Sequence, residues 1–451
     1  MADTAFAIGK YRVEKEIGRG ASSVVYLAYD AFHRRNVAVK QIHAHLLKED
    51  ALSYRYRRSL RNEALIAGQL RHPHIVRLFD ADESALQPYL VLEYVEGDTL
   101  ASYTSPDKLL PVAQVLDIAY KCCSALQHAH SRGLVHRDIK PANVMVQSGG
   151  NVKLTDFGTA ISTRGDQTQI TGLVGSPLYM SPEQVREEQL THQSDMFSLA
   201  VVIYELLTGR RPFAGDSEYA ILYKIGTEDP PAPSSLRAQL PAALDEVILK
   251  AMAKKPKDRY EDWSDFADAL LAINRAMPAK RPQDREAVHF VQMRQLPFFE
   301  GFHDAALWEA LNLGTLHSYP AGSALMKEES PGDSFLIILE GRIAVSRKGI
   351  KLVTIEPGVT LGEMCYLQPD NPMRTATAVA ETDVVALEIR NSGLRISSDD
   401  LQMRFDKAFI RQLVQRLIAT TAKVGAWDVD TSRTGDGGGP ALSLAPMAQK
   451  N

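Results

Sequence analysis

The chain has 451 residues, of which 45% are apolar, and its formal net charge is -4. This length suits about two or three domains, since a domain averages roughly 150 residues. The apolar share excludes a disordered chain, and the small net charge argues against a protein built mainly to bind nucleic acid. No run of about 18 apolar residues is present, so we expect no membrane span.

The N-terminal residues and the cysteines indicate a compartment. The first residues have neither the basic start nor the apolar core of a secretory signal peptide. Of the three cysteines, Cys122 and Cys123 are adjacent, so they cannot build a disulfide framework. We therefore predict a cytoplasmic protein.

The first part of the chain is predicted to form a small sheet with one helix. Residues 11–95 contain short alternating apolar runs, which are typical of strands. One stretch breaks this pattern, with Leu60, Ala64 and Ala67 at helical spacing. From 96 to 273 helical periodicity dominates.

The remaining chain changes its composition along its length. Residues 274–295 hold two prolines and many charges, as a linker does. Residues 296–422 begin helical, continue as strands punctuated by Gly and Pro, and close with another helix. The stretch 428–451 is rich in Gly, Ser and Ala, and we expect a disordered tail there.

A glycine-containing turn separates the first two predicted strands. It begins Ile17-Gly18-Arg19-Gly20 and continues to Val25. A hairpin tip over ATP needs little side-chain bulk, so that its backbone amides can approach the phosphate oxygens. We therefore predict that the segment covers ATP, although such a run taken alone is more often only a turn.

A lysine ends a strand that we expect to be buried, Val37-Ala38-Val39-Lys40. Glu63 lies on the following predicted helix and can pair with it. Phosphoryl transfer needs such a lysine on the α- and β-phosphates and a carboxylate that holds it. The alternatives are a strand lysine that snorkels to solvent and a solvated glutamate.

The central motif supplies acid–base and metal chemistry. Residues 136–143 read His-Arg-Asp-Ile-Lys-Pro-Ala-Asn, and an Asp-Phe-Gly triplet begins at Asp156, thirteen residues after Asn143. This spacing combines a candidate general base, Asp138, with two oxygen ligands for Mg²⁺, Asn143 and Asp156.

With these motifs in order, residues 11–273 resemble a eukaryotic-type Ser/Thr protein kinase of the bacterial branch. The resemblance implies a two-lobed kinase fold, with an N-lobe over 11–95 and a C-lobe over 96–273. It also implies ATP and Mg²⁺ as cofactors. Glu93 and Val95 would belong to the hinge whose backbone binds the adenine edge.

The same resemblance assigns the catalytic roles. Asp138 would accept or orient the proton of the substrate hydroxyl, and Lys140 would neutralise the transferring phosphoryl group. Lys140 favours serine or threonine over tyrosine as the acceptor. Lys40, Asp138, Asn143 and Asp156 are all present, which argues against a catalytically dead scaffold. The expected substrates are proteins.

The segment after Asp156 carries candidate phosphorylation sites. Thr168 or Thr171 is predicted to be autophosphorylated and to engage Arg137, and the alternative is that both are plain polar loop residues. Glu183 is expected to pair with Arg259.

A second resemblance covers roughly 296–422. Leu-Gly362-Glu363-Met followed by Pro-Met-Arg374-Thr375 is similar to the phosphate-binding cassette of cyclic-nucleotide-binding domains. The resemblance implies a β-roll with flanking helices, in which Arg374 neutralises the cyclic phosphate and Glu363 accepts the ribose 2′-OH. Backbone amides near Gly362 and Thr375 would complete the anion site, and the ligand would be cAMP or cGMP.

The whole chain is therefore predicted to be of the α+β class, with two functional hypotheses. In the first, a Ser/Thr kinase is regulated by a cyclic nucleotide bound at its C-terminal domain. In the second, the kinase is constitutive, Arg374 and Glu363 only pair with each other, and the β-roll is a ligand-independent docking or dimerisation module. A homodimer is suggested by Phe409, Leu413 and Leu417, which are spaced by four on the last helix.

Overall fold

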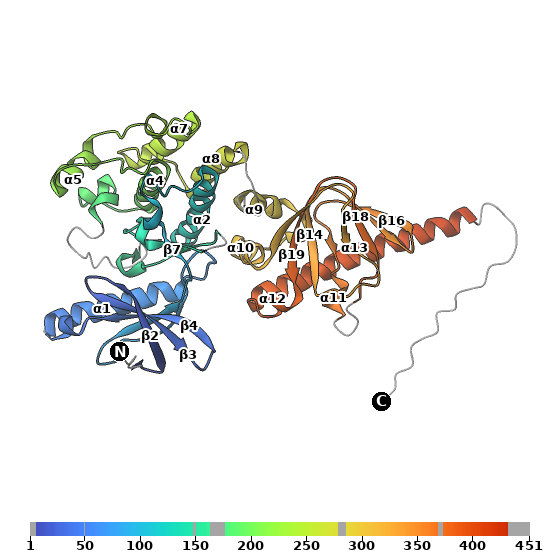
Figure 1. Cartoon of the computed structure of the whole chain (residues 1–451), viewed down its shortest axis with the longest axis horizontal. Coiled ribbons are helices and arrows are strands. Elements are labelled where there is room, and N and C mark those ends of the chain that lie inside the picture. Colours follow the sequence, from blue (N-terminus) through green and yellow to red (C-terminus); the bar gives the residue numbers. More distant parts are fainter. Residues whose placement is uncertain are drawn as a thin grey trace.

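The computed structural model describes residues 6–48, 50–147, 150–162, 176–277, 286–368 and 373–431. Two lobes stacked on each other are followed by a β-roll that lies beside them (Figure 1). Antiparallel sheets and runs of helices occupy largely separate stretches of the chain, so the predicted α+β class is confirmed. Among the described residues, no helix is both long and apolar enough to cross a membrane.

The N-lobe is one six-stranded antiparallel sheet with a helix against it. Alternation of apolar and polar residues buries one face, and Leu60 of the helix packs under Leu90 of the sheet. The strand order is β1-β2-β3-β4-β6-β5. The elements are β1 (Ala7–Ile8), β2 (Tyr11–Arg19), β3 (Ser23–Asp30), β4 (Arg35–Ile42), α1 (Asp50–Gln69), β5 (Leu78–Asp82) and β6 (Tyr89–Glu93).

The C-lobe is built around two helices that are buried almost all round, α2 and α4. A three-stranded sheet, β10-β9-β7, and a two-stranded sheet, β11-β8, hold the loops that carry the central motifs. The helices are α2 (Val112–Ser131), α3 (Pro182–Val185), α4 (His192–Thr208), α5 (Glu218–Thr227), α6 (Pro233–Leu236), α7 (Ala242–Ala251) and α8 (Trp263–Ala276). The strands are β7 (Asp98–Thr99), β8 (Leu134–Val135), β9 (Val144–Val146), β10 (Val152–Leu154) and β11 (Ile161–Ser162).

The C-terminal domain is a β-roll of two four-stranded antiparallel sheets, ordered β12-β19-β14-β17 and β13-β18-β15-β16. Helices flank it, and the longest one extends past the roll (Figure 1). The strands are β12 (Thr315–Tyr319), β13 (Ala324–Met326), β14 (Ser334–Glu340), β15 (Ile343–Arg347), β16 (Ile350–Ile355), β17 (Thr360–Leu361), β18 (Thr377–Ala380) and β19 (Val384–Arg390). The helices are α9 (Glu286–Gln295), α10 (Asp304–Leu313), α11 (Met364–Leu367), α12 (Asn391–Arg395) and α13 (Asp399–Thr431).

The predicted domain boundaries stay predictions, but two elements bear on them. Helix α9 lies within the predicted linker 274–295, and it packs on α2. Helix α13 continues to Thr431 and so corrects the predicted disorder at 428–431. The glycine-rich part of the tail, whose composition opposes a helix, begins only at Gly435.

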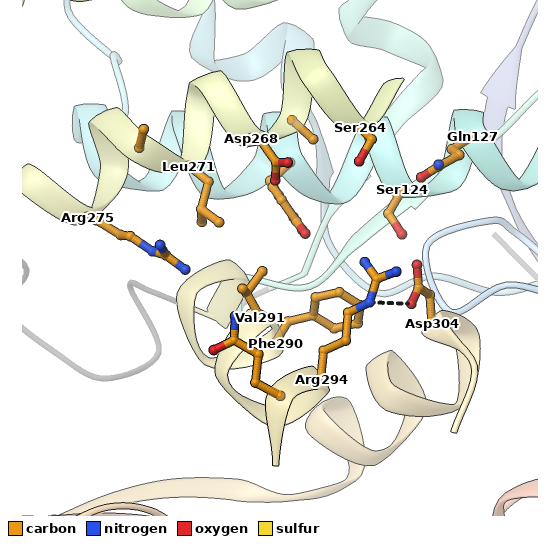
Figure 2. A pocket seen from close by; sticks show the side chains of 14 residues that line it. Ser124, Gln127, Ser264, Asp268, Leu271, Arg275, Phe290, Val291, Arg294 and Asp304 are labelled. Carbon is orange, nitrogen blue, oxygen red and sulfur yellow. Dashed lines mark ion pairs between the residues drawn. The ribbon is translucent and has the colours of Figure 1, made fainter. Parts of the chain in front are cut away.

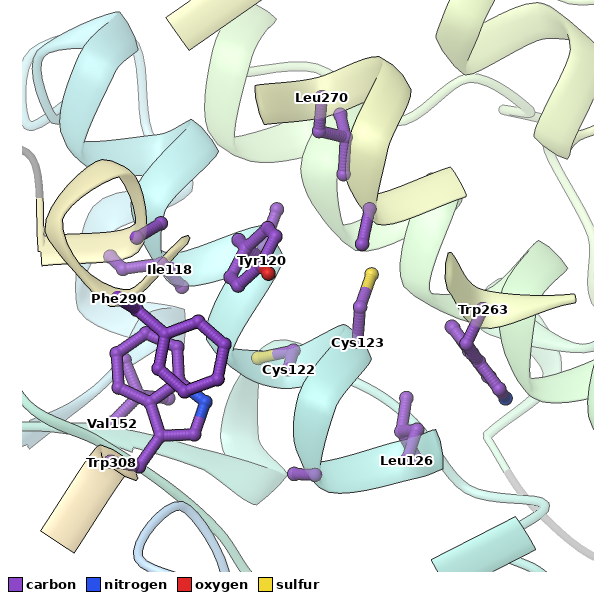
Figure 3. Close-up of a cluster of buried hydrophobic side chains, with 14 of the residues drawn as sticks. Ile118, Tyr120, Cys122, Cys123, Leu126, Val152, Trp263, Leu270, Phe290 and Trp308 are labelled. Atoms are coloured by element: carbon purple, nitrogen blue, oxygen red, sulfur yellow. The ribbon is translucent and has the colours of Figure 1, made fainter. Parts of the chain in front are cut away.

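One hydrophobic core joins the kinase-like C-lobe to the first helices of the C-terminal domain. Figure 3 shows Phe290 of α9 against Trp308 of α10, beside Tyr120 of α2. The two rings stack with centroids 4.2 Å apart and planes 10° apart. Next to this core is a groove lined by residues of α2, α8, α9 and α10, in which Arg294 of α9 pairs with Asp304 of α10 at 3.6 Å (Figure 2).

Candidate active site and candidate nucleotide pocket

Three side chains from distant parts of the chain meet at the base of the N-lobe. Lys40 of β4 donates to Glu63 of α1 at 2.7 Å and to Asp156 at 2.8 Å. Asp156 reaches this place because its backbone adopts a left-handed conformation, with φ of 62°. The predicted Lys40–Glu63 pair is therefore formed, and the solvated alternative for Glu63 is wrong, since only 9% of that side chain is exposed.

Burial and the ion pairs act in opposite directions on this cluster. Burial alone raises the pKa of Asp156, but the nearby ammonium of Lys40 outweighs it and lowers that pKa below its ordinary value. Burial also raises the pKa of Glu63, and Lys40 compensates only in part. For Lys40, both carboxylates overcome burial and raise the pKa. The lysine is thus held as a cation where phosphates would lie.

Residues 136–143, which we predict to be the catalytic loop, bring Asp138 and Lys140 together. Lys140 Nζ donates to Asp138 Oδ2 at 2.6 Å and to Ser176 Oγ at 2.9 Å. The backbone N–H of Ser176 donates to Asp138 Oδ1 at 2.9 Å. A carboxylate and an ammonium therefore lie together at Ser176, a pair that can act on the proton and the charge of a hydroxyl.

Asn143 is oriented by the same loop. Its Nδ2 donates to the carbonyl of Asp138 at 2.8 Å and to Asp138 Oδ2 at 3.2 Å. The amide oxygen therefore points elsewhere and suits a hard cation, as does the carboxylate of Asp156. Among the described residues, no group of three or more His, Cys, Asp or Glu forms a metal cage. This donor set fits Mg²⁺, which typically takes one or two protein ligands together with phosphates and water.

One buried carboxylate that the sequence analysis missed fixes the catalytic loop. Asp195, at the start of α4, accepts from the backbone N–H groups of His136 and Arg137 at 2.8 and 2.9 Å. It is 3% exposed, and burial raises its pKa. An acid in the first turn of an otherwise apolar helix was the available signal, but that position is also favoured by the helix dipole alone.

The expected ion pair behind the catalytic loop is present. Arg259 donates to Glu183 through two nitrogens, at 2.7 and 2.8 Å, and both side chains are buried. Arg137 is 8% exposed, and its Nη2 has no hydrogen-bond partner among the described residues. Thr168 and Thr171 lie outside the described residues.

The predicted ATP contacts from the N-lobe and hinge frame the space above Lys40. Gly18 lies opposite Val25 in the β2–β3 register, and Ile17 is 41% exposed beside it. Gly20 donates its N–H to the carbonyl of Ser23 at 2.8 Å, which closes the tip. In the hinge, the carboxylate of Glu93 pairs with Lys153 at 2.8 Å, and Val95 is buried.

In the β-roll, Arg374 is held by neutral acceptors. Its Nη1 donates to the carbonyls of Ser334 at 2.7 Å and Gly362 at 3.2 Å, and its Nη2 to Ser334 Oγ at 3.4 Å. A Cβ added at Gly332 or Gly362 would overlap the guanidinium. The described carboxylates form no ion pair with Arg374, so its charge remains available for an anion.

The two hypotheses gave Glu363 the ribose 2′-OH or Arg374 as its partner, but the structure pairs it with another residue. Arg416 of α13 pairs with Glu363 at 2.6 Å and donates to the carbonyl of Thr360 at 2.9 Å. The idea that Arg374 and Glu363 only pair with each other is therefore wrong. Thr375, the residue after Arg374, is exposed. Within the described part of the chain, Arg374 thus has no carboxylate partner, while Glu363 links the pocket to α13.

Comparison with known families decides the identity of this fold. Residues 11–299 match the family model described as the protein kinase domain. The chain belongs to the protein kinase family. Its kinase domain is followed by residues 316–396, which match the cyclic nucleotide-binding domain. Both predicted resemblances are confirmed at this level.

Curated relatives share the kinase domain. The serine/threonine-protein kinase PknB of Mycobacterium leprae is 37% identical over 280 residues, 61% of this chain and 44% of that protein. A probable serine/threonine-protein kinase PknB of Lactococcus lactis is 41% identical over 259 residues, 57% of this chain and 41% of that protein. The chain thus spans less than half the length of the curated relatives that it matches.

Proposed function

We propose that the protein is an ATP-dependent Ser/Thr protein kinase that phosphorylates itself and protein substrates. The observation that carries the proposal is the catalytic pair, in which Lys140 lies 2.6 Å from Asp138 and both contact Ser176. The relatives, which are named as Ser/Thr kinases, support the acceptor type.

The residues present divide the work of phosphoryl transfer. Lys40 would bind and orient the α- and β-phosphates, since Glu63 holds its ammonium in place. Asn143 and Asp156 would hold Mg²⁺, which supplies charge neutralisation when bound. Asp138 would take the proton of the acceptor hydroxyl at its carboxylate, and Lys140 would neutralise the charge on the transferring group.

The test is transfer of radiolabelled phosphate from ATP to the protein itself and to a generic basic protein. We expect phosphoserine or phosphothreonine with the wild type and a loss of about 10³-fold or more with Asp138→Asn. Asp216→Asn, an exposed carboxylate, is the matched control and should retain activity. An inactive wild type, or phosphotyrosine as the product, would refute the proposal.

We also propose that Thr168 or Thr171 is the autophosphorylation site. The support is the buried guanidinium of Arg137, whose Nη2 has no partner among the described residues and which a phosphate could satisfy. Phosphopeptide mass spectrometry of the wild type and Asp138→Asn decides the question. Phosphate on neither threonine would sink the idea.

For the C-terminal domain, we propose that cAMP or cGMP binds at Arg374 and regulates the kinase. The guanidinium of Arg374, which pairs with none of the described carboxylates, and the two glycines that make room for it support an anionic ligand. The ribose would have to share Glu363 with Arg416 or displace it, which would alter the attachment of α13. The second candidate, a ligand-independent docking module, is favoured by the existing Glu363–Arg416 pair.

Calorimetry with each nucleotide and a kinase assay with and without it separate these two candidates. We expect binding by the wild type, no binding by Arg374→Glu, and a change in activity that only the wild type shows. Arg347→Glu, on the exposed end of β15, is the control. Absence of binding to both nucleotides would leave the docking module.

Two smaller proposals concern assembly and location. We propose a homodimer through α13, where Ile410, Val414 and Leu417 are exposed at i, i+4, i+7 spacing.

The cytoplasmic location stays a proposal, supported by Cys122 and Cys123, which are buried and form no disulfide.

A further inference from the structure

We propose that Trp308 of the C-terminal domain is a positioning residue for phosphoryl transfer in the kinase domain. It would act through the His-turn, defined as residues 71–77 between α1 and β5, which holds the segment leading to Asp156. The inference rests on the proposed kinase activity. It does not depend on any cyclic nucleotide.

Trp308 is fully buried between the two domains. Its indole Nε1 donates to Ser124 Oγ of α2 at 3.0 Å. Its ring meets the ring of His74 edge-on, with centroids 4.6 Å apart and planes at 73°. Phe290 stacks on it as well (Figure 3). The indole therefore has both a directional bond and two specific ring contacts, which fix its position more narrowly than apolar burial alone.

The two histidines of the His-turn are held in defined forms. Burial lowers the pKa of both His72 and His74 well below the ordinary value, so both are neutral. His74 Nδ1 lies 3.1 Å from the carbonyl of Val152 and must donate to it. His72 Nδ1 accepts from the N–H of His74 at 3.1 Å, which leaves its Nε2 to donate to Ser124 Oγ at 3.3 Å. Ser124 thus joins the indole to the His-turn.

The backbone of the His-turn forms hydrogen bonds with strand β10, which leads to Asp156. The carbonyl of His74 accepts from the N–H of Leu154 at 2.8 Å, and the N–H of Val76 donates to the carbonyl of Leu154 at 2.9 Å. Leu154 stands two residues before Asp156, whose carboxylate contacts Lys40. A shift of Trp308 would therefore be passed to a proposed Mg²⁺ ligand through the ring contact with His74, the backbone hydrogen bond from Leu154 to His74, and the two residues of chain that follow Leu154.

A second set of contacts keeps α9 and α10 against α2. Lys121 of α2 is fully buried and pairs with Asp117 at 2.8 Å and with Glu286 at 2.5 Å. The other oxygen of Asp117 accepts from the N–H of Ala287 at 2.8 Å, in the first turn of α9. These contacts anchor the start of α9 on the kinase domain, so Trp308 is presented to His74 from a fixed base.

The residues between Trp308 and the active site can be perturbed without touching ATP, Mg²⁺ or the acceptor. The reaction depends steeply on geometry, since a misplacement of about 1 Å can cost roughly 10²-fold in rate. We therefore expect Trp308→Ala, in the full chain, to lower kcat/KM for ATP by about tenfold and to raise the Mg²⁺ concentration needed for half-maximal activity. Trp308→Phe keeps the ring contacts and should stay within about threefold of the wild type.

The Mg²⁺ requirement is the readout that a purely structural role would not move, and hydrogen exchange locates the change in the chain. In Trp308→Ala, faster exchange is expected in the His-turn and in 152–157, while the β-roll strands keep their protection. Leu352→Ala, on the exposed strand β16, is the control and should change neither rate nor exchange. If Trp308→Ala unfolds α10, Ser124→Ala decides instead, because it removes only the hydroxyl that joins the indole to His72.

The outcomes separate this inference from the kinase proposal. An inactive wild type refutes the kinase proposal. An active wild type whose folded Trp308→Ala or Ser124→Ala variants keep kcat, KM and the Mg²⁺ requirement overturns the positioning role alone. Higher activity in these variants also overturns it, because the contact would then restrain the site.

Discussion

At the scale of single residues, the proposed nucleotide pocket depends on the absence of a side chain at Gly362. This glycine has φ of 80°, and an added Cβ would overlap Nη1 of Arg374. The pocket can therefore be tested without changing any charged group.

We expect Gly362→Ala to weaken cyclic nucleotide binding by more than about tenfold, because the guanidinium must move and the backbone is strained. Gly349→Ala is matched, since Gly349 has φ of 79° but open space around it. The Gly349→Ala variant should bind the cyclic nucleotide within about twofold of the wild type, because it has the same backbone strain as Gly362→Ala but no clash with Arg374. Calorimetry measures both variants, and equal losses would contradict the role of Arg374.

The buried pair of Glu183 and Arg259 makes stability depend on pH. Burial raises the pKa of Glu183, but Arg259 more than offsets this and holds it below its ordinary value of 4.5. Because the folded-state pKa is lowered, the stabilisation is fully present above about pH 4.5 and is lost as the pH falls through the folded value.

Glu183→Gln is therefore expected to cost about 3–5 kcal/mol at pH 7, with a smaller difference from the wild type at pH 4. Urea unfolding at the two pH values measures this. Glu188→Gln, whose side chain is 53% exposed, should stay within about 0.5 kcal/mol at both. A cost for Glu183→Gln that is independent of pH would refute the ionic origin.

Sequence alone predicted those site residues whose type and spacing the chemistry dictates. Asp138, Asn143 and Asp156 could be named because their two motifs resemble, in residue type and spacing, those that carry the base and the metal ligands in protein kinases. Asp195 could not, since its partners are backbone N–H groups 58 and 59 positions away, which leave no trace in residue type. Arg416 was missed for a similar reason, as its carboxylate partner is 53 positions away.

At the scale of elements, the last helix was predicted, but its faces were not. Phe409 is fully buried, and its ring lies 5.2 Å from that of Phe335, whereas Leu417 is 67% exposed. Residues spaced by four drift around a helix by about 40° per step, so such a stripe turns from the core to solvent. A pattern cannot show where along α13 the β-roll stops covering it.

The exposed residues Ile410, Val414 and Leu417 of the same helix predict assembly into a dimer. Leu417→Glu should convert the proposed dimer to a monomer, because a charge in an apolar helix seam remains unpaired when buried. Gln415→Glu, which adds the same charge at a neighbouring exposed position of the same helix, should leave the dimer intact. Sedimentation velocity distinguishes the species, and a monomeric wild type would end the idea.

At the scale of the whole molecule, regulation requires reciprocity. If a cyclic nucleotide changes the affinity for ATP by some factor, typically about 5–150-fold, ATP must change the affinity for the cyclic nucleotide by the same factor. Calorimetry of the cyclic nucleotide with and without a non-hydrolysable ATP analogue and Mg²⁺ measures this. No change in either direction would mean that the two sites are independent.

The arrangement of the two domains lay beyond sequence analysis. Lys121 belongs to a helix that reads as an ordinary core element, and Glu286 to a stretch that reads as a linker. Their contact at 2.5 Å depends on the surface that the folded C-lobe presents. Periodicity describes one element at a time, so it does not reveal which elements meet.

The shared core around Tyr120 also has a consequence for how the protein folds while it is being synthesised. A ribosome adds about 5–20 residues per second, so Trp308 is made a few seconds after α8 ends at Ala276. During that interval the surface of α2 and the His-turn that Trp308 later contacts is exposed to solvent. If Trp308 positions Asp156 as we propose, the kinase domain reaches its full activity only after α10 has emerged, and translation sets the time of that last step.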